Sequence, residues 1–92
     1  MLKINSTSDY KKDLRKLKKQ NRDLSKLYDV VDKLANGNSL EKKYRDHKLI
    51  GYGIPDCREC HIGPDWLLIY KIIDDDLVLL LISTGSHSNL FK

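Results

Sequence analysis

The chain has few cysteines, few prolines and no long apolar run. Its 92 residues include two cysteines, two prolines, one tryptophan and one phenylalanine. Two cysteines are too few for a disulfide-stapled secreted domain. The longest apolar run, Leu77–Ile82, is far shorter than the roughly 20 residues of a membrane-spanning helix, and the first residues show no signal-peptide pattern. We therefore expect a single cytoplasmic domain over residues 1–92, with no membrane association.

Positive charge is concentrated in the first half of the chain. Residues 1–50 hold 14 Lys and Arg against 7 Asp and Glu, whereas residues 51–92 hold 3 against 6. A lysine-rich helix is often only a solvated surface. The same charge also favours binding to a polyanion, because each neutralised phosphate releases counterions.

The spacing of apolar residues predicts two helices and then a sheet. Apolar residues recur every three or four positions from Tyr10 to Leu17 and again from Leu24 to Leu34, and Gly37 suits the left-handed position that ends a helix. The second set consists of Leu24, Leu27, Tyr28, Val31 and Leu34. Residues 39–56 are typical of a short helical turn followed by a loop. Two such helices with a short connection predict a helical hairpin.

Strand patterns dominate the second half. Strands are expected at Cys57–Ile62, Trp66–Ile73 and Leu77–Ile82, with Asp74–Asp76 as a turn, and a short strand over residues 2–5 is expected at one edge. Short connections between consecutive strands favour an antiparallel meander. The predicted class is α+β, with the helical hairpin packed on a small curved antiparallel sheet.

The pattern Cys57-Arg58-Glu59-Cys60-His61 matches the C-x-x-C-H motif of covalent haem attachment. In a strand, residues three apart point to opposite faces, so the two thiols should not share a haem, a zinc ion or a disulfide. We expect one thiol to be buried and the other partly exposed, and we expect no metal and no cofactor. Gly51-Tyr52-Gly53 does not follow a strand and open a helix, so no nucleotide-binding fingerprint is present.

The three histidines all lie beside turn or loop residues rather than on a helix stripe. They are His47, His61 and His87, and Asp65 lies close to His61 in sequence. Imidazole titrates near pH 6.5 and can give or take a proton at neutral pH. If the fold brings these residues together, they form a candidate acid–base set.

Three motifs in the second half resemble one known family. They are Tyr44-Arg45-Asp46-His47 with Leu49 and Gly51, Arg58-Glu59-Cys60-His61-Ile62 with Pro64-Asp65-Trp66, and Thr84-Gly85-Ser86-His87-Ser88 with Leu90-Phe91. Together with the lysine-rich hairpin, they are similar to the YafQ branch of the RelE/ParE superfamily of bacterial toxins. The resemblance implies a RelE-like fold, cleavage of mRNA on the translating ribosome, and a cognate antitoxin similar to DinJ or RelB. Operator DNA would be bound only through the toxin–antitoxin complex.

The resemblance also implies a set of site residues. His87 would be the general acid, Asp65 or His47 the base or its orienting partner, and His61 a phosphate ligand or second proton carrier. Contacts with RNA are expected from Lys11, Lys12, Lys16, Lys19, Arg45, Arg58, Trp66 and Phe91, with Glu59 and Ser83 in supporting roles. Trp66 and Phe91 each have a second interpretation, as packing residues of the sheet. The lysines would contact ribosomal RNA.

Ser83 departs from the family pattern, which has an arginine before Thr-Gly-x-His. A serine offers one neutral hydrogen bond where a guanidinium can contact phosphate with two charged ones. Two alternatives therefore stay open at this point. Because of Ser83, the chain could be an attenuated relative that acts mainly by binding its antitoxin or another target. A ParE-like toxin that acts on gyrase through its helical hairpin is the other alternative, and the three histidines argue against it because that activity would not need acid–base residues.

Overall fold

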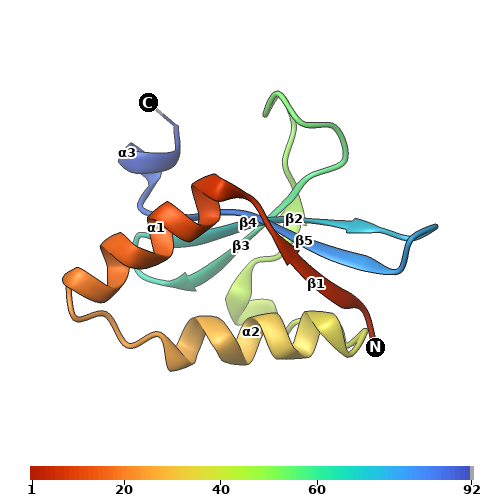
Figure 1. The fold of residues 1–92 in the computed structure, drawn as a ribbon, viewed down its shortest axis with the longest axis horizontal. Coiled ribbons are helices and arrows are strands. Elements are labelled where there is room, and N and C mark those ends of the chain that lie inside the picture. The colour runs from red at the N-terminus through yellow and green to blue at the C-terminus, as the bar shows by residue number, and fades with distance from the viewer. Residues whose placement is uncertain (92) are drawn as a thin grey trace.

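The computed structural model describes residues 1–91, which form a five-stranded sheet covered by helices. The sheet order is β1-β5-β4-β3-β2. The strands are β1 (Lys3–Ser6), β2 (His47–Lys48), β3 (Arg58–Gly63), β4 (Trp66–Ile73) and β5 (Val78–Gly85). The helices are α1 (Ser8–Lys19), α2 (Ser25–Ala35), the 3-10 turn η1 (Lys42–Tyr44) and α3 (His87–Leu90). The predicted α+β class and helical hairpin are confirmed (Figure 1).

The β3-β4-β5 meander is antiparallel as expected, but β1 pairs with β5 in parallel. The expectation of a wholly antiparallel sheet is wrong at this edge, because alternation in a four-residue strand carries no information about its direction. At the opposite edge, His47 of β2 pairs with Glu59 of β3. Strand β2 has only two residues and lies within the region predicted as a loop. This short strand fixes His47 at the edge of the sheet.

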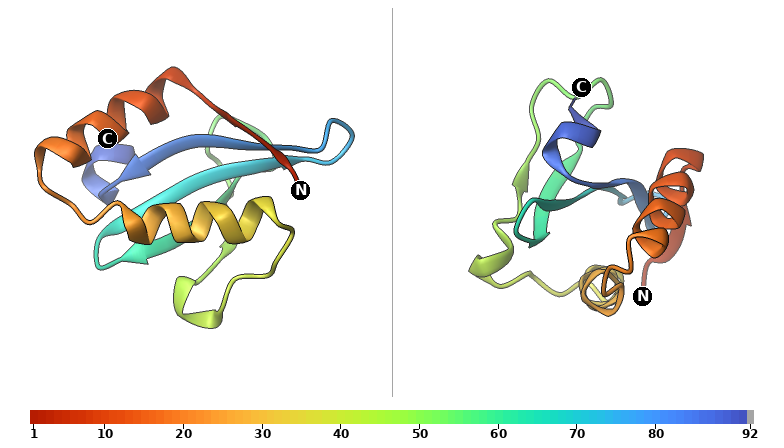
Figure 2. Two further views of the ribbon diagram at one scale, coloured as in Figure 1. Left: turned by 60° about the horizontal axis from the view of Figure 1, so that its bottom comes forward. Right: turned by 90° about the vertical axis from the view of Figure 1, so that its left-hand side faces the viewer.

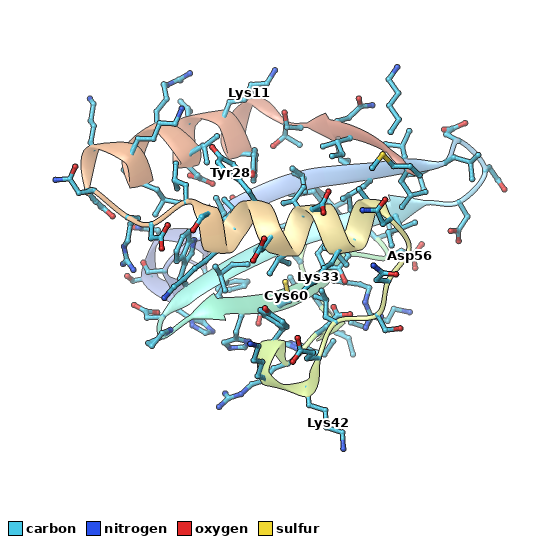
Figure 3. The ribbon with its side chains drawn as sticks, turned by 90° about the horizontal axis from the view of Figure 1, so that it is seen from below. Lys11, Tyr28, Lys33, Lys42, Asp56 and Cys60 are labelled. Carbon is cyan, nitrogen blue, oxygen red and sulfur yellow. The ribbon has the colours of Figure 1, made fainter. Side chains whose placement is uncertain are left out.

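Thr7 caps the N-terminus of helix α1, and its side chain accepts a hydrogen bond from the Tyr10 N–H at 3.0 Å. The Thr7 hydroxyl donates to the Ile82 carbonyl at 2.6 Å, which ties the start of the helix to β5. Tyr10 and Leu17 are buried, as their spacing predicts. The lysines of this helix remain on its exposed side, and Lys11 points away from α2 (Figure 3).

Helix α2 presents a slightly different face to the sheet from the one its sequence predicts. Leu27, Val31 and Leu34 are buried, but Tyr28 is 48% exposed and Val30 is fully buried. The predicted stripe is therefore wrong at Tyr28, because the helix is rotated enough to bring Val30 inward. Gly37 follows with φ +78°, which confirms the left-handed residue expected after the helix.

The two faces of the sheet have separate apolar clusters. The main core lies between the sheet and helices α1 and α2 and includes Cys60, Leu68 and Tyr70. On the opposite face, Cys57, Ile69 and Ile82 pack with residues of the 49–52 segment and α3. Figures 1 and 2 show α2 on one side of the sheet and α3 with the neighbouring loop on the other.

Cys57 and Cys60 lie on opposite faces, as their spacing in a strand predicts. Both thiols are fully buried, so the expectation that one is partly exposed is wrong. Burial raises the pKa of Cys60 to about 12 and also raises the pKa of Cys57. The loop and α3 cover the sheet face on which Cys57 lies, and this cover was not evident from the local pattern.

Strand β5 starts one residue later than predicted, because Leu77 belongs to the turn after Asp74–Asp76. Its φ is +54° and its side chain is 64% exposed. No helix in the described part of the chain has the length and apolar character needed to cross a membrane.

Candidate active site

Three imidazoles from three different elements gather at one edge of the sheet. His47 lies on β2, His61 on β3 and His87 at the start of α3. The ring centroids of His47 and His61 are 6.4 Å apart, as are those of His61 and His87. The expectation that the histidines converge is therefore confirmed, although each begins in a separate segment of the sequence.

Strand geometry explains this convergence. Glu59 and His61 are two residues apart on β3 and share the face opposite the main core. His47 is the register partner of Glu59, which places its ring beside that of His61. Gly85 ends β5 at φ +152°, a conformation that favours glycine, and the chain then turns into α3 with His87 as its first residue.

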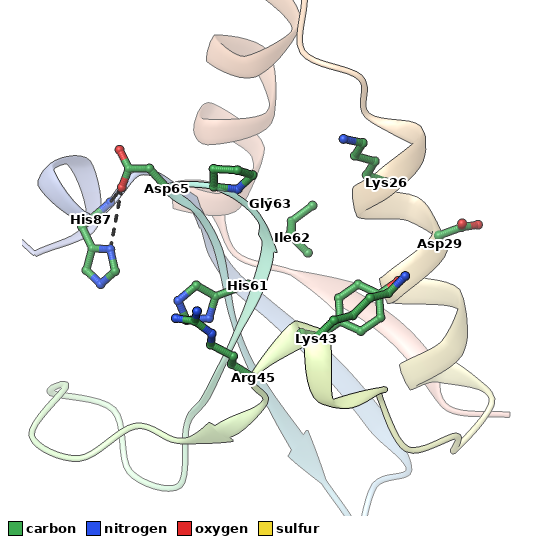
Figure 4. A pocket seen from close by; sticks show the side chains of 11 residues that line it. Lys26, Asp29, Lys43, Arg45, His61, Ile62, Gly63, Asp65 and His87 are labelled. Carbon is green, nitrogen blue, oxygen red and sulfur yellow. Dashed lines mark hydrogen bonds and ion pairs between the residues drawn. The ribbon is translucent and has the colours of Figure 1, made fainter.

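A cavity of about 840 Å³ opens beside His61 and His87 (Figure 4). Three positively charged side chains, Lys26, Lys43 and Arg45, line it together with Asp29 and Asp65. Arg45 and His61 both line this cavity. We call this cavity the histidine cleft. Its lining combines groups that can exchange protons with cations that attract an anion.

His47 is held between two acceptors. Its Nδ1 lies 2.7 Å from the backbone carbonyl of Arg45, and its Nε2 lies 3.4 Å from Glu59 Oε1. Arg45 ends the η1 turn in a left-handed conformation, with φ +48°, which aims its carbonyl back at the ring. Only a protonated Nδ1 can donate to a carbonyl, so Nε2 is the nitrogen that can gain or lose a proton.

Glu59 is 4% exposed, and His47 is the partner that its carboxylate faces. A buried carboxylate requires a nearby positive charge or hydrogen-bond donor. A proton gained by His47 would therefore be stabilised by Glu59. This geometry agrees with the supporting role expected of Glu59.

Asp65 holds the start of α3. Its Oδ1 accepts a hydrogen bond from the His87 backbone N–H at 3.2 Å and lies 3.7 Å from His87 Nδ1. Asp65 occupies the β3–β4 turn at φ +48°. The carboxylate can thus orient the imidazole and stabilise its protonated form, while Nε2 of His87 stays free of this contact.

His61 has a different environment. Its Nδ1 is buried without a hydrogen-bond partner. A buried N–H without an acceptor is costly, so the favoured tautomer carries its proton on Nε2. His61 can then donate a hydrogen bond to an anion in the cleft.

Phe91 lies beside the histidines, with its ring centroid 5.6 Å from that of His87. Its other neighbour is Tyr52, at 5.9 Å in an edge-to-face arrangement. Phe91 is 41% exposed, so part of its ring is available for contact with a base. Tyr52 was missed by sequence analysis, although an aromatic residue between two glycines is a signal that could have drawn attention to it.

Ser83 lies on the sheet face opposite the main core, as the histidines do, but it does not line the histidine cleft. It is buried, and its hydroxyl donates to Asp13 Oδ2 of α1 at 2.7 Å. The same carboxylate oxygen accepts the Thr84 backbone N–H at 3.1 Å. The serine proton is therefore already used, and no guanidinium stands at position 83.

Trp66 packs in the main core, which agrees with the second of its two interpretations. Its side chain is 4% exposed, and its Nε1–H donates to Thr84 Oγ1 at 3.0 Å. The Arg22 guanidinium lies 5.6 Å from the ring centroid and covers it further. Contact of Trp66 with RNA bases is therefore withdrawn.

Arg58 is also outside the cleft, because it points to the face occupied by α2. Its guanidinium donates to Asp46 at 3.3 and 3.4 Å, and the Tyr70 hydroxyl donates to the same carboxylate at 2.6 Å. This network connects η1 to the sheet. Arg58 is therefore held by Asp46 outside the histidine cleft, whereas Arg45 lines it, and the expected contacts of both residues with RNA stay predictions.

A short α+β domain with a helical hairpin, and with three clustered imidazoles beside a cationic cleft, has the features expected of a RelE-like toxin. A family model described as "Bacterial toxin of type II toxin-antitoxin system, YafQ" matches residues 2–92. The chain therefore belongs to the YafQ toxin family of type II toxin–antitoxin systems.

Individual relatives agree with this assignment. The chain is 36% identical over 89 residues to the mRNA interferase toxin YafQ of Escherichia coli K12, covering 96% of this chain and 94% of the relative. A metal-bound toxin from Helicobacter pylori has 47% identity and a TM-score of 0.93, covering 99% of this chain and all of the other. YafQ in the E. coli DinJ–YafQ complex has 32% identity and a TM-score of 0.90, with both chains fully covered.

The metal-bound relative raises the question of whether this chain could hold an ion. Within residues 1–91, no three His, Cys, Asp or Glu side chains are arranged so that they could ligate one metal. The carboxylates nearest the imidazoles, Glu59 and Asp65, contact His47 and His87 respectively.

Proposed function

We propose that this protein is a ribosome-dependent endoribonuclease that cleaves mRNA through attack of an RNA 2′-hydroxyl on the adjacent phosphorus. The convergence of His47, His61 and His87, beside a cationic cleft that His61 and His87 line, is the observation that carries this proposal. Such a reaction needs one group to accept a proton, one to donate a proton, and donors that stabilise the added negative charge.

His47 is the proposed base. Its Nε2 accepts the proton of the 2′-hydroxyl while the new bond from O2′ to phosphorus forms. The carbonyl of Arg45 holds Nδ1–H, and Glu59 stabilises the resulting imidazolium from 3.4 Å. Asp65 is then left in the other role considered for it, as an orienting partner.

His87 is the proposed acid. The bond between phosphorus and O5′ breaks, and Nε2 of His87 gives its proton to the leaving oxygen. Asp65 stabilises the protonated ring through its contact with Nδ1 at 3.7 Å. The products are a 2′,3′-cyclic phosphate and a 5′-hydroxyl, which balances the two proton transfers.

His61 and Arg45 are the proposed phosphate ligands. The Nε2–H of His61 donates to a non-bridging oxygen, and the Arg45 guanidinium, which lines the same cleft, offsets the negative charge that builds up in the transition state. Phe91, next to His87, packs against a neighbouring base.

Replacement of each histidine by glutamine tests these roles on ribosome-bound message. We expect cleavage to slow by at least about 100-fold in each variant, because general acid or base catalysis contributes roughly 10²–10⁴-fold. Asp75→Asn, in the turn between β4 and β5, is the control and should cleave at the wild-type rate. If all three histidine variants cut like wild type, the site assignment is wrong.

The proposed partner is a DinJ-like antitoxin that neutralises the toxin in the cytoplasm and provides the contact with operator DNA. This follows from membership of the family and from the DinJ–YafQ complexes among its structural relatives. Expression without the antitoxin should arrest growth, and co-expression should restore it.

A second candidate function rests on Ser83. Because its hydroxyl is committed to Asp13, position 83 contributes no charge to the cleft. The chain would then be an attenuated toxin that acts mainly by binding its antitoxin or another target. Growth that continues normally without the antitoxin, with no cyclic-phosphate products, would favour this alternative.

A further inference from the structure

Three cavities are lined in part by residues between Ser83 and Leu90, at the end of β5 and in α3, and they share some of their lining residues. The histidine cleft and a small cavity of about 110 Å³ are both lined by Asp65. That small cavity shares Asp13, Lys16 and Asn89 with a third one of about 610 Å³. The histidine cleft and the third cavity, which we call the α1 groove, are therefore related through residues that the small cavity shares with each of them.

The α1 groove is rich in positive charge. Lys12, Arg15, Lys16 and Lys19 line it, and Asp9 and Asp13 are its acidic residues. The Asp13 carboxylate is already engaged by Ser83 and Thr84, so its charge is partly offset by hydrogen bonds. The excess of positive over negative side chains in the groove favours an anionic ligand.

Ser83 is part of the groove lining. An arginine at this position would add a guanidinium to the groove lining, whereas the serine adds no charge and its hydroxyl is bonded to Asp13. The nearest available cations are then on the wall formed by α1. The positive charge that position 83 lacks can therefore be supplied by the lysines of α1, which line the same groove.

An aromatic side chain also lines the groove. Tyr52 contacts Phe91, and Phe91 contacts His87 in the histidine cleft. Stacking of bases on aromatic rings is tolerant of sequence and suits single-stranded RNA. An acidic protein segment would use the lysines but would gain no base-stacking energy from this aromatic pair.

We propose that the α1 groove binds the RNA strand next to the cleavage point, and that Lys12 and Lys16 supply there the positive charge that position 83 lacks. The inference deepens the proposed function, on which it rests, because it assigns these lysines to the substrate rather than to ribosomal RNA. It also separates them from Lys11, which lines none of the three cavities.

The helix provides a matched pair of double variants. Lys12→Gln with Lys16→Gln removes two charges from the groove. Lys11→Gln with Lys18→Gln removes two charges from the same helix, but neither residue lines any of the three cavities. Lys16 and Lys18 both belong to the last turn, so the effect on the helix dipole is matched as well.

Binding is measured with purified toxin and a short single-stranded RNA that carries 2′-O-methyl groups, which prevents cleavage. For two lost phosphate contacts we expect affinity to fall roughly 10- to 30-fold near 0.1 M salt, with the slope of log K against log salt reduced by about 1.4. The Lys11 and Lys18 variant should bind nearly as tightly as wild type. Equal loss in both double variants, or no binding by wild type, would overturn the proposal.

Two further measurements make the test specific. Ser83→Arg, introduced into the Lys12 and Lys16 double variant, should restore most of the lost affinity, and failure to do so would contradict the link to position 83. Loss of antitoxin binding without loss of RNA binding would instead assign the groove to the partner protein. If wild type binds the probe through the groove but cleaves no message, the proposed function fails while the groove assignment stands.

Discussion

The contact between Asp13 and Ser83 makes a quantitative prediction about stability. Asp13→Ala removes the acceptor of both the Ser83 hydroxyl and the Thr84 N–H, which belong to residues 7% and 2% exposed. A buried polar group left without a partner costs about 1–3 kcal/mol, so we expect a loss of about 2–4 kcal/mol in the free energy of unfolding. Such a loss is a large share of the stability of a small domain.

Urea unfolding followed by fluorescence measures this loss, because Trp66 is the only tryptophan and is buried next to Thr84. The control is Asp29→Ala, an exposed carboxylate in the middle of α2, which undergoes the same change in helix propensity. Asp13→Asn keeps one acceptor oxygen and should lose about half as much as Asp13→Ala. In thermal unfolding, each kcal/mol corresponds to about 4–8 °C.

A double-mutant cycle completes the test. Ser83→Ala with Asp13→Ala should destabilise less than the sum of the single variants, with a coupling energy of about 1 kcal/mol, since the two residues share one hydrogen bond. If Asp13→Ala changes the free energy of unfolding by less than about 0.5 kcal/mol, as an ordinary surface substitution does, the carboxylate is solvated and the serine hydroxyl is free to act elsewhere.

Further predictions follow from other contacts. Burial favours the neutral thiol of Cys60 and raises its pKa to about 12. The unfolded chain loses this proton near pH 9, so the free energy of unfolding should be unaffected by Cys60 below that pH and should fall as the pH rises from about 9 to 12. Titration by urea unfolding across this range, with Cys60→Ala as the comparison, checks the sign. Asp65→Asn should slow cleavage, because the His87 ring loses its orienting carboxylate, and an unchanged rate of cleavage would remove Asp65 from the proposed role. Arg58→Gln should destabilise the fold yet leave the rate of cleavage by the folded protein within about twofold of wild type, since its partner is Asp46.

Local patterns predicted the elements that have strong periodicity. Leu27, Val31 and Leu34 repeat at helical spacing and are buried, and Cys57 and Cys60 lie on the opposite faces that strand geometry requires. The parallel direction of β1 was beyond reach, because alternation is the same in parallel and antiparallel strands. Val30 was missed for a similar reason, since a small rotation of α2 decides whether Val30 or Tyr28 faces inward.

The site was harder to predict where contacts join distant segments. The motifs marked the three histidines, but nothing in the local sequence around Ser83 shows that its partner lies 70 residues earlier. One signal was present, because Asp13 is an isolated acid in a lysine-rich stretch and lies next to Leu14 at the edge of the apolar stripe. Trp66 and Arg58 show the converse: both belong to a functional motif, yet the fold uses one for the core and the other to hold η1.

Position 83 illustrates why a motif has to be interpreted in three dimensions. Along the sequence, serine in place of arginine is a loss of charge within a catalytic motif. In the fold, Ser83 of β5 lines the same groove as Lys12 and Lys16 of helix α1. The positive charge that one strand residue lacks can therefore come from the first helix, and the effect of Ser83 on cleavage depends on whether RNA follows that groove. We expect Ser83→Arg to increase cleavage only in the variant that lacks Lys12 and Lys16. That result would mean that the phosphate contacts have moved from position 83 to helix α1 and have not been lost.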